Sequence, residues 1–392
     1  MLIKFIMASI LSLFCCIPAY AIVVSNATAL EEAVAAAHEG GDRSIFLENG
    51  QYTLSGPLVV RVDNVTVRSL SGDRDNVTVF GNGMNGTISH VFLVYADGFH
   101  LHDVTIGKVA YHGVQFQPGA SLAVLQNLRI IDCREQMVKG AYDSSQPDIV
   151  SRESIIENCL FEYTAGIGPQ SYIGGIDVHA GVDWIVRGNT FKNIKSPSGS
   201  LAEHAVHFWS GASGTLVENN IIINCDRGIG FGLGDRGHVN GIIRNNMIVH
   251  DGSGSFADVS IGLESAEGAV VVQNSIYMAS SYPNAIEYRF TTTKNVLLAN
   301  NLTNRAIVSR DGGEASVSDN LTTAQADWFV DLSSGDLHLV SAVDSVVGAA
   351  PLLSQAPQDF DGQLRQNPTD IGADTMTTLP DLGYVLLLLL DS

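Results

Sequence analysis

The chain repeats a short pattern of apolar and polar positions between residues 124 and 320. In each repeat an apolar residue stands three positions before an asparagine, and another apolar residue follows within two positions. Successive asparagines are 31, 31, 31, 26, 28, 26 and 20 residues apart. They are Asn127, Asn158, Asn189, Asn220, Asn246, Asn274, Asn300 and Asn320, and Asp103 stands at the same place one turn earlier. Steps of this size indicate a solenoid.

The apolar runs in these repeats are short and rich in β-branched residues, as in 215–218, 241–244 and 270–273. They have no helical period, so they predict strands. One repeat is too small to bury its own apolar face, and therefore successive coils must stack. An asparagine at a fixed place in each coil can donate and accept hydrogen bonds along the stack, and it tolerates the left-handed backbone of a sharp bend.

A second strand-like run follows each of these positions. The runs are 113–117, 136–139, 175–179, 205–209, 228–232, 258–262, 285–289 and 306–310. We therefore expect an all-β, single-stranded right-handed parallel β-helix, with neighbouring coils about 4.8 Å apart.

Both ends of the repeat carry capping signals. Thr28 to Glu31 reads as a capping box, followed by an alanine-rich amphipathic helix that covers the first coil. We expect an N-terminal cap over 22–43, coils over 44–322, and a C-terminal closing region over 323–376 before a tail at 377–392. Residues 1–21 have Lys4, an apolar stretch and an A-x-A site ending at Ala21, which predicts a signal peptide and a secreted protein, extracellular or periplasmic.

The composition restricts the partners. The whole chain has a net charge of −20, and residues 22–392 hold 20 Lys and Arg against 41 Asp and Glu. This charge repels nucleic acid. No run after the signal peptide is long enough to cross a membrane. The three cysteines after it, Cys133, Cys159 and Cys225, lie in apolar contexts and are expected to be buried thiols, and we expect a monomer.

The start and the end of the repeat region resemble known β-helix proteins. The predicted helix followed by 46–52 (FLENGQY), the coils with asparagine, and the closing motifs at 359–362 (DFDG) and 370–374 (DIGAD) are similar to secreted bacterial proteins of the pectin-lyase-like superfamily. The resemblance covers about residues 25–375. It includes the branch of alginate and chondroitin lyases and the mannuronan epimerases, and it implies a polysaccharide ligand.

Alternation along the strands predicts a site independently of that resemblance. With Val178 and Phe208 in the core, Asp177, His179, His207 and Trp209 face solvent. Stacking places Asp177 beside His207 and His179 beside Trp209. The carboxylate would fix the imidazole tautomer, and an exposed Trp would stack on a sugar ring. The preceding strand, 136–139, has two possible registers. We prefer the one with Val138 inward, which brings Lys139 into the column of His179 and Trp209, because with Met137 inward Lys139 would be buried without a partner.

The next strand adds a second set of candidates. Its outward positions, including Gly230 and Gly232, are all glycine, which predicts a bare strip of backbone that a ligand could approach. The pairs Asp226-Arg227 and Asp235-Arg236 flank this strip, either to bind a carboxylate or simply as turn residues. Three long loops, 141–153, 164–172 and 196–204, are expected to wall a groove over these coils.

β-Elimination on a uronic-acid polymer would use these residues in three roles. Lys139, or alternatively His207, is the candidate base. Arg227 or Arg236 would neutralise the carboxylate, and His179 or His204 would protonate the leaving oxygen. The resemblance implies a Lys base, which Lys139 matches.

Other functions stay open at this point. A C5-epimerase uses the same first proton transfer, and Asp177 with Asp235 would be the carboxylates of a glycoside hydrolase. We expect no cofactor; a divalent metal such as calcium, with ligands among Asp177, His179, His204 and His207, is the alternative. A non-catalytic protein that binds glycans, or a structural protein of the cell surface, remains the competing hypothesis.

Overall fold

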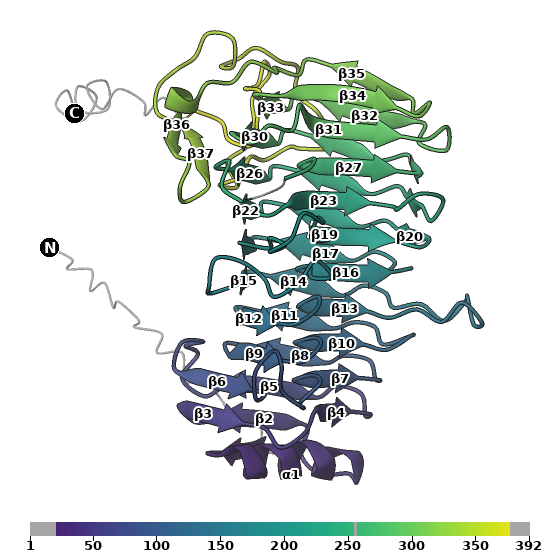
Figure 1. Cartoon of the computed structure of the whole chain (residues 1–392), viewed down its shortest axis with the longest axis vertical. Coiled ribbons are helices and arrows are strands. Elements are labelled where there is room, and N and C mark those ends of the chain that lie inside the picture. Colours follow the sequence, from purple (N-terminus) through teal and green to yellow (C-terminus); the bar gives the residue numbers. More distant parts are fainter. Residues whose placement is uncertain (1–20, 255–256, 377–392) are drawn as a thin grey trace, which may run out of the picture.

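The described residues of the computed structural model, 21–254 and 257–376, form a tall parallel β-solenoid with one α-helix at its base (Figure 1). This architecture confirms the expected fold class. The predicted signal peptide up to residue 20 and the tail from 377 lie outside the described residues.

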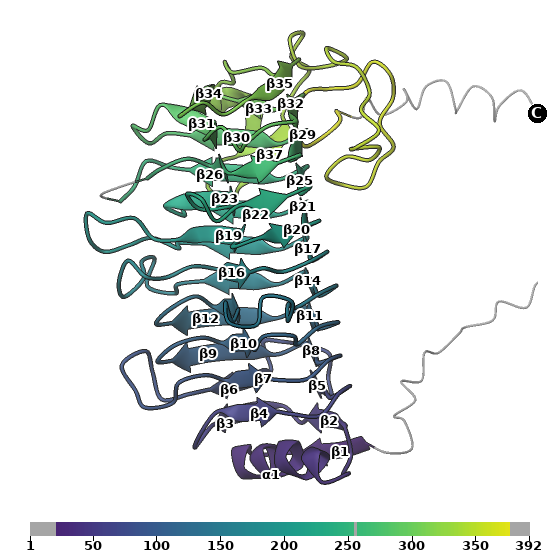
Figure 2. The ribbon, with the colours of Figure 1, turned by 90° about the vertical axis from the view of Figure 1, so that its right-hand side faces the viewer.

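Three parallel sheets run the length of the solenoid, and a coil contributes one strand to each (Figure 2). The first sheet consists of β1 (Ala21–Val24), β2 (Ser44–Leu47), β5 (Thr66–Ser69), β8 (His100–His102), β11 (Val124–Gln126), β14 (Ile155–Glu157), β17 (Ile185–Arg187), β21 (Leu216–Glu218), β25 (Ile242–Arg244), β29 (Val270–Val272), β32 (Val296–Ala299) and β35 (Ala315–Ser318).

The second sheet follows the asparagines directly. Its strands are β3 (Gly50–Thr53), β6 (Val77–Phe80), β9 (Thr105–Val109), β12 (Arg129–Cys133), β15 (Leu160–Glu162), β18 (Thr190–Lys192), β22 (Ile221–Ile223), β26 (Met247–His250), β30 (Ser275–Met278) and β33 (Leu302–Thr303). The sequence pattern did not separate these strands from the strands before the asparagine, because in most coils only two residues lie between a strand of the first sheet and the next strand of the second sheet.

The third sheet, which we call the site sheet, matches the second set of predicted runs. It contains β4 (Leu58–Val60), β7 (Phe92–Val94), β10 (Val114–Phe116), β13 (Val138–Gly140), β16 (Ile176–His179), β19 (His204–Trp209), β23 (Arg227–Phe231), β27 (Ile261–Glu264), β31 (Asn284–Arg289) and β34 (Ala306–Arg310). The runs at 136–139 and 258–262 are displaced, since β13 begins at Val138 and β27 begins at Ile261. Short strands β20 (Ala212–Ser213), β24 (His238–Val239) and β28 (Ala266–Glu267) lead back to the first sheet.

The structure contains the predicted asparagine ladder. Asparagines recur at two adjacent positions of the bend, and only the second position forms the ladder. At the second position, Asn220 donates through Nδ2 to Asn246 Oδ1 at 2.9 Å and to the Val186 carbonyl at 3.0 Å. Asn189, Asn246, Asn274, Asn301 and Asn320 continue this buried ladder. The assignment of Asn127, Asn158 and Asn300 to it was wrong. These three lie one position earlier with φ of 51°, 56° and 57°, where the left-handed bend selects asparagine. Asp103 stands at the same bend position with φ of 59°, and it accepts from Asn127 Nδ2 at 2.8 Å.

The helix α1 (Ala27–His38) covers the first coil, as predicted, but its start differs from the expectation. Asn26, rather than Thr28, is the N-cap, and its side chain accepts from the Ala29 amide at 3.0 Å. Glu31 does not close a capping box. Its carboxylate instead accepts hydrogen bonds from the Ser55 backbone and hydroxyl, which ties the helix to the first coil.

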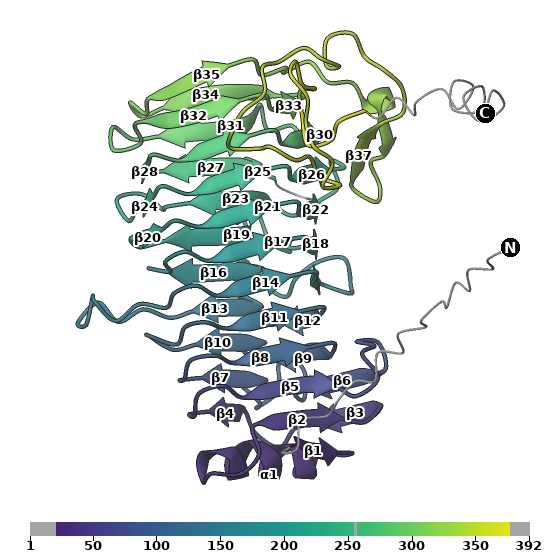
Figure 3. The same ribbon diagram turned by 180° about the vertical axis from the view of Figure 1, so that it is seen from behind.

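After Asn320 the chain turns back along the outside of the coils (Figures 1 and 3). Following a 3-10 turn, η1 (Ala326–Trp328), it forms an antiparallel pair, β36 (Phe329–Asp331) and β37 (Asp336–Leu339). An apolar cluster that includes Phe329 and Leu337 packs on Met247 of the second sheet. Arg365 anchors the last segment by donating to the carbonyls of Gly372 and Ala373 at 3.0 and 2.7 Å.

The interior of the coils is filled with aliphatic and aromatic side chains along the whole height of the solenoid. The three cysteines are buried free thiols, as expected, and burial raises the pKa of each of them. Among the described residues, no helix has the length and apolar character that a membrane crossing requires.

Candidate functional site on the site sheet

The register of the site sheet brings Lys139, Asp177 and His207 into one outward column. Lys139 pairs with Asp177 and Asp177 pairs with His207, while His179 pairs with Trp209 in the next column. Val138 points inward, as preferred from the sequence. Lys139 was expected in the column of His179 and Trp209, and this expectation was wrong. Lys139 lies two residues away along the strand, in the column of Asp177, because β13 begins at Val138 rather than at residue 136.

The side chains of this column form a connected cluster with Trp209 and His179. The Lys139 ammonium group makes an ion pair with Asp177 Oδ2 and donates to His179 Nε2 at 3.1 Å. Since Nε2 accepts, His179 Nδ1 carries the proton and donates to Ser210 Oγ at 3.1 Å. Trp209 Nε1 donates to Asp177 Oδ1 at 2.6 Å. The Asp177 carboxylate thus holds one cation and one indole in place.

These contacts fix the charge states within the cluster. Burial opposes ionisation of Asp177, but the Lys139 charge and the neighbouring His207 outweigh it and lower the pKa of the carboxyl below 3.8. Burial, and then the Lys139 charge, lower the pKa of His179 to about 4. At neutral pH His179 is therefore a neutral imidazole beside a charged ammonium group.

The expectation that these side chains face solvent was wrong for two of them. Asp177 and His207 point outward from the coil, yet only 3% and 1% of their surfaces are exposed, because the outward side chains cover one another. Trp209 is half-buried rather than open to a sugar. Its ring packs against His179 and His207, and the Arg236 guanidinium lies 3.8 Å from its centroid.

The predicted bare strip of glycine backbone is also covered. The buried imidazole of His204 stands over it, and a Cβ added to Gly230 would meet His204 Nε2 at 2.7 Å. Gly230 therefore provides the space in which His204 lies. Gly232 has φ of 78° and ends the strand in a turn, where a Cβ would meet the Glu264 carbonyl oxygen at 1.7 Å.

The two Asp-Arg pairs have different surroundings. Asp226 is buried and accepts from the amides of Ser196 and Ala202, so it holds a loop as a turn residue would. Arg227 is paired with Asp258 at 3.2 Å. Asp235 and Arg236, in contrast, are exposed. Arg236 is the more exposed arginine of the two pairs, since the Arg227 side chain is 25% exposed.

An open pocket of about 540 Å³ lies beside the cluster at the carboxyl ends of the site-sheet strands. It is lined by Tyr142, Ser144, His179, Ser210, Gly211, Asp235, Arg236 and Gly237. A base, a cation and hydroxyl groups therefore face one cavity.

Of the three long loops expected to wall the groove, one does so. Tyr142 and Ser144 belong to the excursion after β13, which projects from the solenoid in Figures 1 and 3. The loops 164–172 and 196–204 precede β16 and β19 and enter the sheet at the amino ends of the strands, so they line no part of this pocket.

Sequence reasoning missed Tyr142, Ser210 and Glu203. Tyr142 lies in a loop that was singled out only for its length, three residues after Lys139, and this proximity was a usable signal. Ser210 follows Trp209 directly, and its contact with His179 depends on strand pairing between coils.

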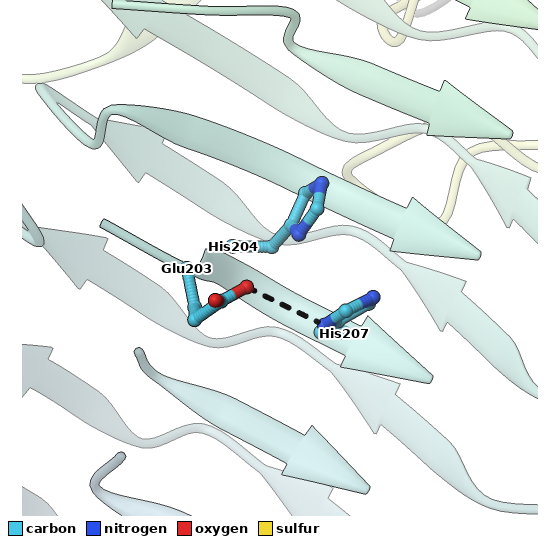
Figure 4. A group of neighbouring side chains, drawn as sticks. All are labelled: Glu203, His204 and His207. Carbon is cyan, nitrogen blue, oxygen red and sulfur yellow. Dashed lines mark ion pairs between the residues drawn. The ribbon is translucent and has the colours of Figure 1, made fainter. Parts of the chain in front are cut away.

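Two groups of side chains among the described residues have the spacing of metal ligands. One is Glu203, His204 and His207 at the start of β19 (Figure 4), and the other is His338, Asp361 and Asp374 in the C-terminal segment. Neither is the set of four residues suggested by the sequence.

No protein-family model and no curated protein sequence matches the chain. Among solved structures, it is similar to an alginate lyase from Paenibacillus sp. str. FPU-7, with 18% identity and a TM-score of 0.54 over 77% of this chain and 99% of that one. It is also similar to the pectate lyase Pel9A (14%, TM-score 0.49, 85% and 88% covered). A third is the A-module of the Azotobacter vinelandii mannuronan C-5 epimerase AlgE4 (13%, TM-score 0.47, 76% and 95% covered). The chain therefore shares the parallel β-helix fold of the alginate lyase, which is the fold that the sequence predicted.

Proposed function

We propose that this chain is a carbohydrate-active protein that cleaves a uronic-acid-containing polysaccharide by β-elimination at the open pocket. The observation that carries the proposal is the convergence of His179, Arg236 and Tyr142 on one cavity of about 540 Å³. The alginate lyase with the same fold supports the substrate class as an analogy between folds. The predicted signal peptide supports a secreted protein, which would meet such polymers outside the cell.

Arg236 is the proposed partner of the substrate carboxylate. Its guanidinium carbon lies 3.8 Å from the centroid of the Trp209 ring, and its N–H groups can make a bidentate contact with a carboxylate. Neutralising the carboxylate makes the C5 proton more acidic. With a net charge of −20 on the whole chain, a local cation is needed to hold an anionic polymer.

His179 is the proposed base, and Tyr142 is the proposed acid. His179 is neutral, since its pKa is lowered to about 4, but its Nε2 lone pair accepts from Lys139. When the Lys139 ammonium group gives up its bond to Nε2 and keeps its ion pair with Asp177, Nε2 can accept the C5 proton. The C5–H electrons form the C4–C5 double bond, the C4–O bond breaks, and the Tyr142 phenol protonates the leaving oxygen. His207 and His204 are too buried to contact substrate in this role.

The test is the ultraviolet absorbance of unsaturated uronide ends during incubation with alginate, pectate and glycosaminoglycans. We expect a signal on one polymer that His179→Asn abolishes. Proton exchange at C5 in deuterated water without chain cleavage would identify an epimerase instead. The proposal is wrong if neither absorbance nor exchange occurs on any polymer while glycan binding is retained, which would indicate a non-catalytic binding protein.

A further inference from the structure

Glu203, His204 and His207 gather at the amino end of β19, where the loop 193–203 enters the site sheet (Figure 4). One ligand atom from each lies within 4.8 Å of the others. We propose that these three residues bind one divalent transition-metal ion of the Zn²⁺ class. This site is separate from the proposed lyase pocket, which none of the three lines.

The hydrogen bonding of His207 leaves one ring nitrogen turned toward carboxylates. His207 Nε2 lies 3.1 Å from the Gly232 carbonyl and must donate to it, because a carbonyl only accepts. In the neutral ring Nδ1 then carries a lone pair. That atom lies 3.7 Å from Asp177 Oδ1 and 4.0 Å from Glu203 Oε2, both too far for a hydrogen bond.

The repulsion between this lone pair and the two carboxylates is relieved either by a proton on Nδ1 or by a metal ion bound between them. Ligand atoms of a tetrahedral ion at about 2.0–2.2 Å lie roughly 3.3–3.6 Å apart. The 4.0 Å between His207 Nδ1 and Glu203 Oε2 would therefore close by a few tenths of an ångström when the ion binds. A histidine ligand that donates its other N–H to a backbone carbonyl is the usual arrangement at such sites, because that bond fixes the tautomer.

His204 provides an independent observation. It is 6% exposed, and its buried Nδ1 has no hydrogen-bond partner. Such a buried polar nitrogen is costly unless something binds it. The ring has this position because Gly230 and Gly262, on two successive coils, offer no side chain where it stands. Figure 4 shows the imidazoles of His204 and His207 and the Glu203 carboxylate gathered at one place on β19.

The donor set determines which ion fits. Two imidazole nitrogens and one carboxylate oxygen favour Zn²⁺ and its transition-metal neighbours over Ca²⁺ or Mg²⁺, which prefer oxygen alone. A small cavity of about 60 Å³ reaches His204, one of the three ligands. The ion would tie the loop 193–203 to β19 and hold His207 against the Trp209 ring, 5.2 Å away between centroids.

The experiment uses the full chain, stripped of metal with EDTA and titrated with ZnCl₂ by calorimetry, with Co²⁺ absorbance as the readout of nitrogen ligation. Glu203→Gln and His207→Gln remove ligands, and Asp361→Asn is the matched control because it disables the other candidate cluster. We expect one equivalent of Zn²⁺ in the wild type and in Asp361→Asn, and binding at least about 10-fold weaker in the two ligand variants.

Circular dichroism would check that each variant is folded. Glu203 is half-buried in a loop, and Glu203→Gln keeps the size of its side chain. The proposal is overturned if the wild type binds no Zn²⁺, in which case a protonated His207 accounts for the two carboxylates. It is also overturned if Asp361→Asn removes binding while Glu203→Gln retains it. These measurements do not use polysaccharide, so their outcome is independent of the lyase proposal.

Discussion

Lys139 and Asp177 are 38 residues apart in the chain, yet strand pairing between neighbouring coils places them side by side, and their charges form an ion pair almost out of contact with solvent. Their side chains are 11% and 4% exposed. A buried pair of this kind contributes little net stability compared with apolar residues, but removing one partner leaves an uncompensated charge. The pair also sets the orientation of His179 and Trp209.

Asp177→Asn is therefore expected to destabilise the protein by about 3 kcal/mol. The amide oxygen can still accept from Trp209, but the amide nitrogen would face the Lys139 ammonium group. Urea unfolding measures the effect, with Asp148→Asn on an exposed loop as the control. The double variant Lys139→Met/Asp177→Asn should lose less than the sum of the two single variants. Additive losses would show that the charges do not interact.

The ladder predicts different costs at two neighbouring positions of the bend. Asn220→Ala removes a buried amide. The Val186 carbonyl loses its side-chain donor, and the backbone amide and Nδ2 of Asn189 lose the Asn220 Oδ1 that accepts from them, so we expect a loss of about 2–3 kcal/mol. Asn158→Gly keeps the left-handed backbone at φ 56° and should change stability by only a few tenths, about 0.5 kcal/mol or less. Equal melting temperatures for the two variants would contradict the distinction between ladder and bend.

Gly230→Ala tests whether glycine is required beneath His204. The added methyl would come within 2.7 Å of the imidazole, so the ring must move, and we expect a loss of about 1–3 kcal/mol. Gly199→Ala is the matched control, since nothing lies within 4 Å of a Cβ there. A Gly230→Ala variant as stable as this control would mean that His204 has another place to go.

Buried histidines predict a loss of stability in acid. Burial, with a further contribution from nearby His207, lowers the pKa of His238 from 6.5 to about 3. As pH falls from 6.5 toward 3, the unfolded chain takes up this proton first, so stability is complete above pH 6.5 and declines through that window. His238→Asn should flatten the melting temperature against pH, relative to His38→Asn on the helix surface. An unchanged slope would exclude His238 as a source of the decline.

The sequence was sufficient to predict the coils because the repeat is a local property. Strand runs of period two and an asparagine at each bend are visible in any single coil. The ladder was assigned one residue out of place at Asn127, Asn158 and Asn300, because left-handed backbone and amide stacking select the same residue at adjacent positions. The return of the C-terminal segment along the second sheet could not be derived, since it depends on apolar side chains that face outward there, such as Met247.

At the site, the alternation along the strands correctly predicted which side chains point out of the coil, but not which of them other side chains would bury. It placed Asp177 beside His207 and His179 beside Trp209, and both pairs are confirmed. It could not show that His204 fills the space over Gly230 or that Arg236 lies on Trp209, because both contacts are between coils and involve long side chains. Lys139 was displaced by one pleat because alternation shows which face a residue lies on but not which inward residue of the next strand it pairs with; Val138 pairs with Ile176.

The most direct test of the proposed function compares two arginines that the sequence could not separate. Arg236 lines the open pocket, and Arg227 is paired with Asp258 outside it. On the polymer that gives an absorbance signal, we expect Arg236→Gln to lower kcat/KM by about 100-fold and Arg227→Gln to stay near the wild type. Loss of activity in Arg227→Gln with an active Arg236→Gln would contradict the placement of the substrate carboxylate at Arg236.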